Sequence, residues 1–201
     1  MRVADMSPAH VLEPTYDAIR RRLIAGLWHP GQRLEAARIA DDLGVSITPV
    51  RDSLNRLTGE RLVHALSGDG FSVPRLTEAD LRDLIDWHRL IVVMALDRLT
   101  ADELPRPPSG HDGVADWTAL LFATITSTFG STEVNAASAS AAARLGAYRD
   151  AEMGPFPDVL TELQHLEDGL NEADMARTRT GIEFYHRRRR DAASLLVEAL
   201  R

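Results

Sequence analysis

The first part of the chain alternates short helical patterns with turn residues. Apolar side chains recur at spacings of three and four between Tyr16 and Leu23, which predicts a helix over about residues 10–28. Pro30-Gly31 is a dipeptide that typically ends a helix. The sequence therefore begins with an amphipathic helix that stops near residue 30.

Two shorter helices are expected next. The first covers about residues 35–43, and Gly44 is a typical C-cap for it because glycine tolerates positive φ. Ser46 has the position of an N-cap for the second, which covers about residues 48–58 and has its apolar residues on one face. The spacing predicts two helices that are joined by a tight turn.

The pattern changes from helical to strand-like at residues 62–73. Two short apolar stretches flank the turn sequence SGDG, which predicts a β-hairpin. Three helices followed by a hairpin is the element order of a winged helix-turn-helix. We therefore expect residues 1–75 to form a winged helix-turn-helix domain that binds DNA.

The remaining chain has helical patterns throughout. Asp80 follows Thr77 by three residues and makes a variant of the capping box, which marks the start of a helix. A loop rich in proline and glycine is expected at 101–113. The expected helices cover about residues 77–99, 114–129, 132–149, 157–171 and 173–200. The fold class is therefore expected to be mostly α, with an all-α bundle over residues 76–201.

Composition narrows the classes of function. The chain has 201 residues, 44% of them hydrophobic, and no cysteine, which excludes disulfides, thiolate metal sites and cysteine nucleophiles. No apolar run approaches the roughly 20 residues that span a bilayer, and no signal-type stretch opens the chain. These features predict a cytoplasmic protein without a membrane partner.

Charge is distributed unevenly along the chain. The net charge is −7, but residues 1–75 hold ten arginines and nine acidic residues, whereas residues 76–201 hold 13 and 21. A local basic face in the first part can therefore still meet phosphates. The arginine run at residues 187–190 winds around a helix without making one face, which favours a solvated or interdomain-pairing stretch over nucleic-acid binding.

The segment GVSITPVRDSLNRL, residues 44–57, carries the main functional signal. In a helix-turn-helix, the N-terminal residues of the second helix face base edges in the major groove. Arg51 lies one turn into this helix, where a guanidinium can reach a guanine or a phosphate, and Arg56 lies on its outer side, facing phosphates. The short side chains near its start are Ser46, Thr48 and Pro49. The alternative is an ordinary helix pair with solvated arginines.

Residues 15–100 resemble the GntR family of bacterial transcription regulators. The matching elements, in order and spacing, are Pro30-Gly31-x-Arg33-Leu34, Thr48-Pro49-Val50-Arg51 and Gly70-Phe71-x-Val73. The long helix after Thr77 and the helical remainder resemble the branch of that family with an FCD domain, a helical C-terminal domain of the fatty-acid-repressor type. The resemblance implies a DNA-binding regulator.

The resemblance also assigns residues to the DNA. It gives the groove-reading positions to Ser46, Thr48, Pro49 and Arg51, and it places Arg33 close to the DNA backbone. It gives the wing tip, which can reach the minor groove, to Gly68, Asp69 and Gly70. The chain departs from the family at Ile47, where arginine is common, and at Arg61, where glycine is common. The operator is therefore expected to differ from those of close relatives.

Many FCD domains hold a divalent metal through Asp-x-x-x-His on one helix and single histidines on two later helices. By the resemblance, the four ligand positions are Ala119, Ala123, Leu163 and Tyr185 in this chain. We therefore expect no metal and no other cofactor, with His165 and His186 as a fallback pair for a metal.

The family's common arginine and glutamate on the first helix of this domain are replaced by His88 and Val92, which predicts a less polar pocket. The candidates for effector binding are His88, Trp117, Tyr148, His165 and Tyr185. For each of them the alternative is a packed core residue.

We expect a homodimeric repressor that binds an inverted-repeat operator in double-stranded DNA, with a helical domain that dimerises and senses a small-molecule effector. Two alternatives stay open: a DNA-binding regulator without a ligand, and a small-molecule-binding protein or enzyme. The chain has no Gly-rich phosphate loop, no H-E-x-x-H and no convincing acid–base pair. We therefore expect that it is not an enzyme.

Overall fold

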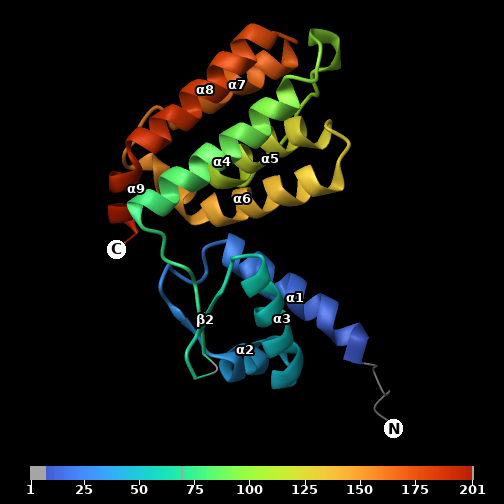
Figure 1. Cartoon of the computed structure of the whole chain (residues 1–201), viewed down its shortest axis with the longest axis vertical. Coiled ribbons are helices and arrows are strands. Elements are labelled where there is room, and N and C mark those ends of the chain that lie inside the picture. Colours follow the sequence, from blue (N-terminus) through green and yellow to red (C-terminus); the bar gives the residue numbers. More distant parts are fainter. Residues whose placement is uncertain (1–7, 69, 201) are drawn as a thin grey trace. The chain divides into compact units, whose positions relative to one another are not determined.

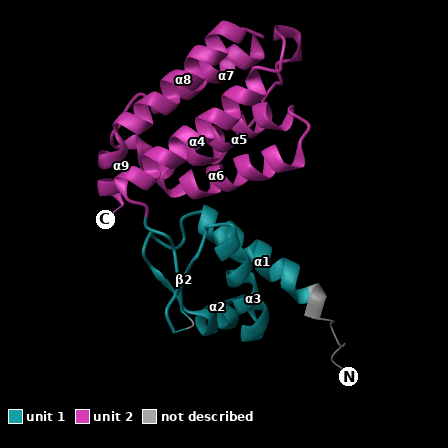
Figure 2. Cartoon of the chain, viewed as in Figure 1, with its two compact units in different colours: residues 1–75 teal, residues 76–201 magenta. Residues whose placement is uncertain are grey.

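The computed structural model describes residues 8–68 and 70–200. These residues form two compact units that divide between Arg75 and Leu76 (Figure 2). Among the described residues, no helix is long and apolar enough to cross a membrane.

The N-terminal unit combines a helical layer with a small sheet (Figure 1). Its helices are α1 (Pro8–Ile24), α2 (Ala36–Leu43) and α3 (Ile47–Gly59), and its strands are β1 (Arg33–Leu34), β2 (His64–Leu66) and β3 (Gly70–Ser72). The strands are antiparallel in the order β1-β3-β2, with Phe71 opposite both Leu34 and Ala65. The sequence predicted the β2–β3 hairpin but missed β1, which is too short to show a pattern.

The core of this unit lies where α1 packs on α3. Ile19, Leu54 and Leu57 are fully buried there, as their helical spacing predicts. The prediction that the first helix runs to about residue 28 was wrong, because α1 ends at Ile24. Gly26 has a φ of +66°, which allows the chain to leave the helix two residues later.

The C-terminal unit is a helical bundle. Its helices are α4 (Glu78–Leu96), α5 (Val114–Ser127), α6 (Thr132–Asp150), α7 (Val159–Asn171), α8 (Met175–Asp191) and α9 (Ala193–Ala199), with short 3-10 turns η1 (Ala101–Glu103) and η2 (Ala151–Met153). The central helix α4 packs against α5, α6, α8 and α9, and α7 packs against α5 and α8. The expected capping box is confirmed, because the Thr77 N–H donates to Asp80 at 2.9 Å and the Thr77 hydroxyl accepts from the Asp80 N–H.

The last helix was predicted as one element over residues 173–200, and this prediction was wrong. The chain leaves α8 at Ala192, where φ is −97° and ψ is 16°, and then starts α9. The break turns α9 against α4 and η2, so that Ala193 and Leu196 become buried. No proline or glycine marks the break, since it depends on packing between distant segments.

Candidate functional site

The helix-turn-helix depends on how α2 ends. Gly44 follows α2 with a φ of +66°, in the left-handed region that favours glycine. Its N–H donates to the carbonyl of Asp41 at 3.2 Å, and the N–H of Val45 donates to that of Ala40 at 3.1 Å. These two bonds form a Schellman motif, which closes α2 and directs the chain into α3.

The start of α3 is open to a ligand. Ser46 is the N-cap residue, with extended backbone angles, but its side chain makes no capping hydrogen bond. Ser46, Ile47 and Thr48 are all exposed. The first N–H groups of a helix lack intrahelical acceptors and carry the positive end of the helix dipole. This end of α3 therefore offers backbone donors and two hydroxyls to a phosphate or a base edge.

The two predicted arginines of α3 have different surroundings. Arg51 lies one turn after Ile47 and is partly exposed. Arg56 lies about 8 Å farther along the helix axis, where its Nη1 donates to Glu13 at 2.7 Å and its guanidinium stacks on Tyr16 at 3.8 Å. The hydrogen bond to Glu13 raises the pKa of Arg56. Arg56 is thus tied to α1, and a phosphate would have to compete with Glu13 for it.

The wing gathers three of the other predicted residues. Arg33 is exposed on β1, in register with Ser72 of β3. Its Nη2 atom would lie 3.4 Å from a Cβ placed on Gly70, so its side chain runs beside the hairpin. Gly68 is exposed at the turn with a φ of +83°. Asp69, the third predicted residue of the wing tip, lies outside the described residues.

The fold and this site define a class of protein domain. Helix α3, the second helix of the helix-turn-helix, starts at the surface and is followed by the β2–β3 hairpin, which forms a three-stranded antiparallel sheet with β1. The N-terminal unit is therefore a winged helix-turn-helix, a class of domain that inserts this helix into the major groove of DNA.

Comparison with known proteins shows what the N-terminal unit is similar to. Residues 13–73 match the model of the family described as bacterial regulatory proteins, gntR family. The chain is 28% identical over 93 residues to the HTH-type transcriptional regulator YdhC of Bacillus subtilis, covering 44% of this chain and 42% of YdhC. It is 30% identical over 90 residues to the HTH-type transcriptional regulator McbR of Escherichia coli, covering 43% and 41%. Residues 13–73, within the N-terminal unit, thus match the GntR family, and the chain spans less than half the length of each of these two relatives.

Solved structures show the same fold over both units. The Escherichia coli McbR/YncC structure has a TM-score of 0.66 at 18% identity and covers 94% of this chain and 98% of its own. A GntR-type protein from Rhodococcus sp. RHA1 has a TM-score of 0.71 at 21% identity, with coverages of 94% and 99%. The expected fold class, mostly α with a winged helix-turn-helix and a helical bundle, is therefore confirmed.

The interior of the bundle contains a buried pair of histidines. His88 of α4 and His186 of α8 are 0% and 1% exposed. His186 Nδ1 lies 2.8 Å from the carbonyl oxygen of Ile182 and therefore donates to it, so Nε2 accepts from His88 Nδ1 at 2.8 Å. Burial lowers the pKa of both imidazoles, that of His186 to about 3. Both rings are neutral near pH 7, and the remaining nitrogen of His88 is a buried acceptor without a partner among the described residues.

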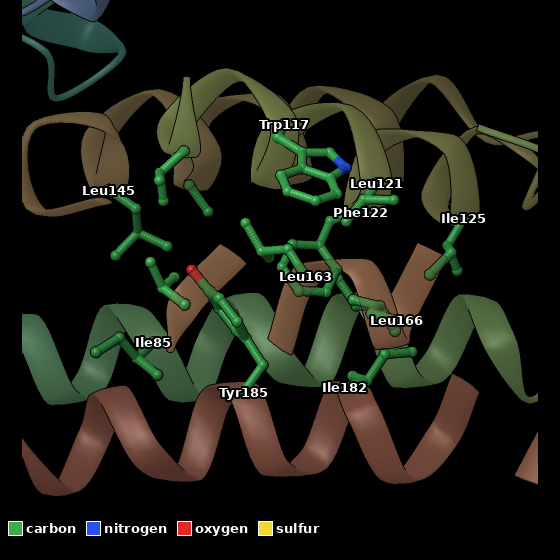
Figure 3. Close-up of a cluster of buried hydrophobic side chains, with 14 of the residues drawn as sticks. Ile85, Trp117, Leu121, Phe122, Ile125, Leu145, Leu163, Leu166, Ile182 and Tyr185 are labelled. Atoms are coloured by element: carbon green, nitrogen blue, oxygen red, sulfur yellow. The ribbon is translucent and has the colours of Figure 1, made fainter. Parts of the chain in front are cut away.

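A buried ion pair lies beside the histidines. Arg189 of α8 is 2% exposed, and its guanidinium donates to Glu152 at 2.7 Å and also to Glu162. Glu152 also accepts from the Tyr185 hydroxyl at 3.0 Å, and burial together with this carboxylate raises the Tyr185 pKa to about 12. Figure 3 shows Tyr185 reaching from α8 into the cluster of buried side chains. The charge of Arg189 is therefore compensated by protein carboxylates.

Arg149 of α6 differs from Arg189 in this respect. It is 2% exposed, and none of its three guanidinium nitrogens has a hydrogen-bond partner among the described residues. Its guanidinium carbon lies 5.9 Å from the centre of the Phe122 ring. A narrow cavity with room for about one water molecule adjoins it. The cavity is lined by Leu81, Ile85, Leu145, Tyr148, Arg149, Glu152, Tyr185, His186, Arg189 and Leu196.

The structure brings together three of the five predicted effector residues. Tyr148 and Tyr185 line the cavity, and His88 bonds to His186 at its wall. Trp117 does not line it, because its ring stacks on His111 at 4.2 Å and its N–H donates to Glu167 at 3.1 Å.

His165 lies elsewhere, exposed in an open groove along α7 and α8. The core-facing positions of α7 belong to Leu163 and Leu166 instead. The fallback pair of His165 and His186 is therefore not a pair, since one histidine is at the surface and the other is inside the bundle.

The residues at the family's metal positions do not fit a metal. Ala119, Ala123 and Leu163 have no donor atom, and the Tyr185 hydroxyl is already bonded to Glu152. Within the part of the chain that the structure describes, no three histidines or carboxylates are grouped as metal ligands.

Sequence reasoning missed Arg149, Glu152 and Arg189 as interior residues. One signal was present for Arg149, which follows Leu145 by four residues and therefore shares its helix face. Charged side chains are rarely fully buried unless paired, so helix periodicity alone did not indicate that Arg149 lies inside.

Proposed function

We propose that this chain is a homodimeric, sequence-specific DNA-binding transcription regulator that acts as a repressor. The observation that carries the proposal is the open start of α3, where Ser46 and Thr48 are exposed and Ser46 makes no capping bond. Arg51 follows one turn later, within reach of a base edge in a groove-bound helix. The wing with Arg33 and Gly68 supplies a second contact to the backbone or the minor groove.

An exposed apolar stripe on α4 supports a dimer. Trp87, Leu90 and Met94 are 50%, 53% and 42% exposed, and their spacing places them on one side of the helix. Contiguous exposed apolar side chains of this size are typical of protein–protein contacts. A two-fold dimer through this stripe would present two winged domains, which supports an operator that is an approximate inverted repeat.

The polar interior of the bundle supports a role in sensing an effector. A ligand that binds more tightly when the dimer is arranged away from its operator lowers the affinity for DNA by the same coupling factor. The buried guanidinium of Arg149 has no hydrogen-bond partner among the described residues. A ligand that accepts its hydrogen bonds would remove the free-energy cost of burying these donors unpaired.

The test is DNA binding by the Arg51→Ala variant, measured by fluorescence anisotropy on the chain's own promoter and on a scrambled duplex at the same salt concentration. We expect the wild type to prefer the promoter, and R51A to lose about 10–100-fold in affinity for it with little change on the scrambled duplex. Arg21→Ala is the matched control, since Arg21 is exposed on α1. Equal affinity of wild type and R51A for both duplexes would contradict the proposal.

A further inference from the structure

Helix α3 leaves one aliphatic side chain at the surface, at the end where the proposed contact with DNA begins. Ile47 is the first residue of α3 and is 43% exposed. The other aliphatic side chains of this helix, Val50, Leu54 and Leu57, are fully buried. Packing within the N-terminal unit therefore accounts for those three side chains, but it leaves much of Ile47 in contact with water.

The groups around Ile47 are polar. Ser46 and Thr48, on either side of it, are exposed, and Arg51 follows one turn later on the same side of the helix. A helix that enters the major groove presents its N-terminal residues to the base edges. Ile47 would then lie against the bases, beside side chains that can form hydrogen bonds with them.

The chemistry of the major groove restricts what Ile47 can contact. Isoleucine has neither a donor nor an acceptor in its side chain. Against the edge of guanine, adenine or cytosine it would displace water from polar atoms and give them no hydrogen-bond partner. The edge of thymine differs, because it carries a 5-methyl group beside its single acceptor. An isoleucine at a base edge therefore favours thymine over the other bases.

We propose that Ile47 is a specificity-determining residue that recognises thymine through its 5-methyl group. The inference rests on the proposed DNA binding and deepens it, since it names the base chemistry that the start of α3 selects. Arg51 would read its base by hydrogen bonds, and Ile47 would read another base by apolar contact. A G·C pair at the position of Ile47 is disfavoured as well, because its polar atoms would stay unpaired.

A single exposed apolar side chain is common on protein surfaces, so the test has to measure the methyl contact itself. If Ile47 contacts thymine, affinity for the promoter depends on one methyl group of the DNA. Burial of one such group changes affinity by about fourfold. A surface side chain without a contact to DNA gives no such dependence.

The experiment measures binding of the full chain to its own promoter by fluorescence anisotropy, with each thymine of the operator replaced in turn by deoxyuridine. Deoxyuridine pairs with adenine as thymine does and lacks only the 5-methyl group. We expect about a fourfold loss of affinity at one thymine in each half-site, and little change at the others. If no replacement weakened binding, the proposal would be wrong.

Variants then assign the methyl contact to a side chain. Ile47→Ala removes most of the aliphatic surface, and we expect it to bind the thymine and deoxyuridine duplexes with equal affinity. Leu27→Ala is the matched control, since Leu27 is 62% exposed in the same unit but lies outside α3 and the wing. L27A should keep the fourfold difference. A difference that persists undiminished in I47A would overturn the proposal.

Thr48 has a methyl group of its own, so its contribution is separated from that of Ile47. Thr48→Ser removes this methyl and keeps the hydroxyl, and we expect T48S to keep the fourfold difference between the two duplexes. If T48S lost the difference and I47A kept it, the contact would belong to Thr48 and not to Ile47.

The preference of the wild type for the promoter over a scrambled duplex is measured in the same series. A wild type that prefers the promoter but responds to no deoxyuridine contradicts the role of Ile47 and leaves the proposed DNA binding standing. Equal binding to the promoter and the scrambled duplex contradicts both.

Discussion

At the scale of single residues, the same backbone turn is made by different side chains. A Schellman motif closes α2 with Gly44 at φ +66°, and another closes α3 with Arg61 at φ +60°. In the second, the N–H of Arg61 donates to Thr58 and that of Leu62 donates to Leu57, both at 3.0 Å. A side chain with a Cβ is strained in this region, whereas glycine is not. Arg61 stands at a position where members of the GntR family commonly have glycine.

The strain leads to a stability prediction for α3. Arg61→Gly should raise the free energy of unfolding by about 1 kcal/mol, because it removes the clash between Cβ and the backbone. Gly44→Ala introduces the same clash into α2 and should lower it by a similar amount. Urea denaturation of the full chain measures both changes. If R61G proved less stable than the wild type, the arginine side chain rather than backbone strain would decide stability there.

At the scale of elements, the arginine run of α8 shows how one helix distributes four adjacent charges. Arg187 is exposed, Arg188 pairs with Asp158 and Glu162, Arg189 is buried with Glu152, and Arg190 pairs with Asp86 of α4. Each residue turns about 100° from the last, so the run meets three neighbouring segments and solvent. The expectation of a solvated or interdomain-pairing run was wrong for Arg189, because this position faces the core and pairs with carboxylates of its own unit.

The buried ion pair of Arg189 and Glu152 should contribute far more to stability than the exposed ion pair of Arg190 and Asp86. Arg189→Met removes the partner of Glu152, which is 1% exposed, and should lower the free energy of unfolding by about 3–5 kcal/mol. Arg190→Met is the adjacent control, and it should change stability little because its ion pair with Asp86 is exposed to solvent. Thermal unfolding of both variants gives the comparison, and equal losses would argue against a special role for the buried pair.

At the scale of the whole molecule, the proposed dimer connects the exposed stripe of α4 to DNA binding. A single winged domain reads only one half-site, and two domains in one dimer gain affinity because the second contact becomes intramolecular. Among the described residues, the apolar side chains of the stripe stay about half exposed, and a second subunit would bury them.

Breaking the stripe should separate the two subunits. Leu90→Glu places a carboxylate in the centre of the proposed contact, and we expect a shift from dimer to monomer in sedimentation velocity, together with weaker binding to the promoter. Leu195→Glu is the control, since Leu195 is also an exposed leucine but lies outside the stripe, on α9. A dimer that survives L90E unchanged would place the contact on another surface.

The sequence by itself determined the parts of this protein that depend on near neighbours. The order of helices and hairpin, the Gly44 turn and the capping box at Thr77 follow from residues within about five positions of each other, because helix caps and periodicity act over that range. The winged helix-turn-helix class was therefore predictable, and the DNA contacts at the start of α3 stay a prediction. Strand β1 and the end of α8 were not predictable, since each depends on a partner far along the chain.

Only the tertiary structure decided the interior of the bundle. His88 and His186 are 98 positions apart, and Arg189 reaches a carboxylate 37 positions away, so no local pattern could pair them. Packing put Trp117 and His165 away from the cavity and brought Arg149 to its wall. The reason is physical. Whether a charge can be buried depends on the groups that surround it in space, whereas helix periodicity predicts only which face points inward and not which side chains it contacts.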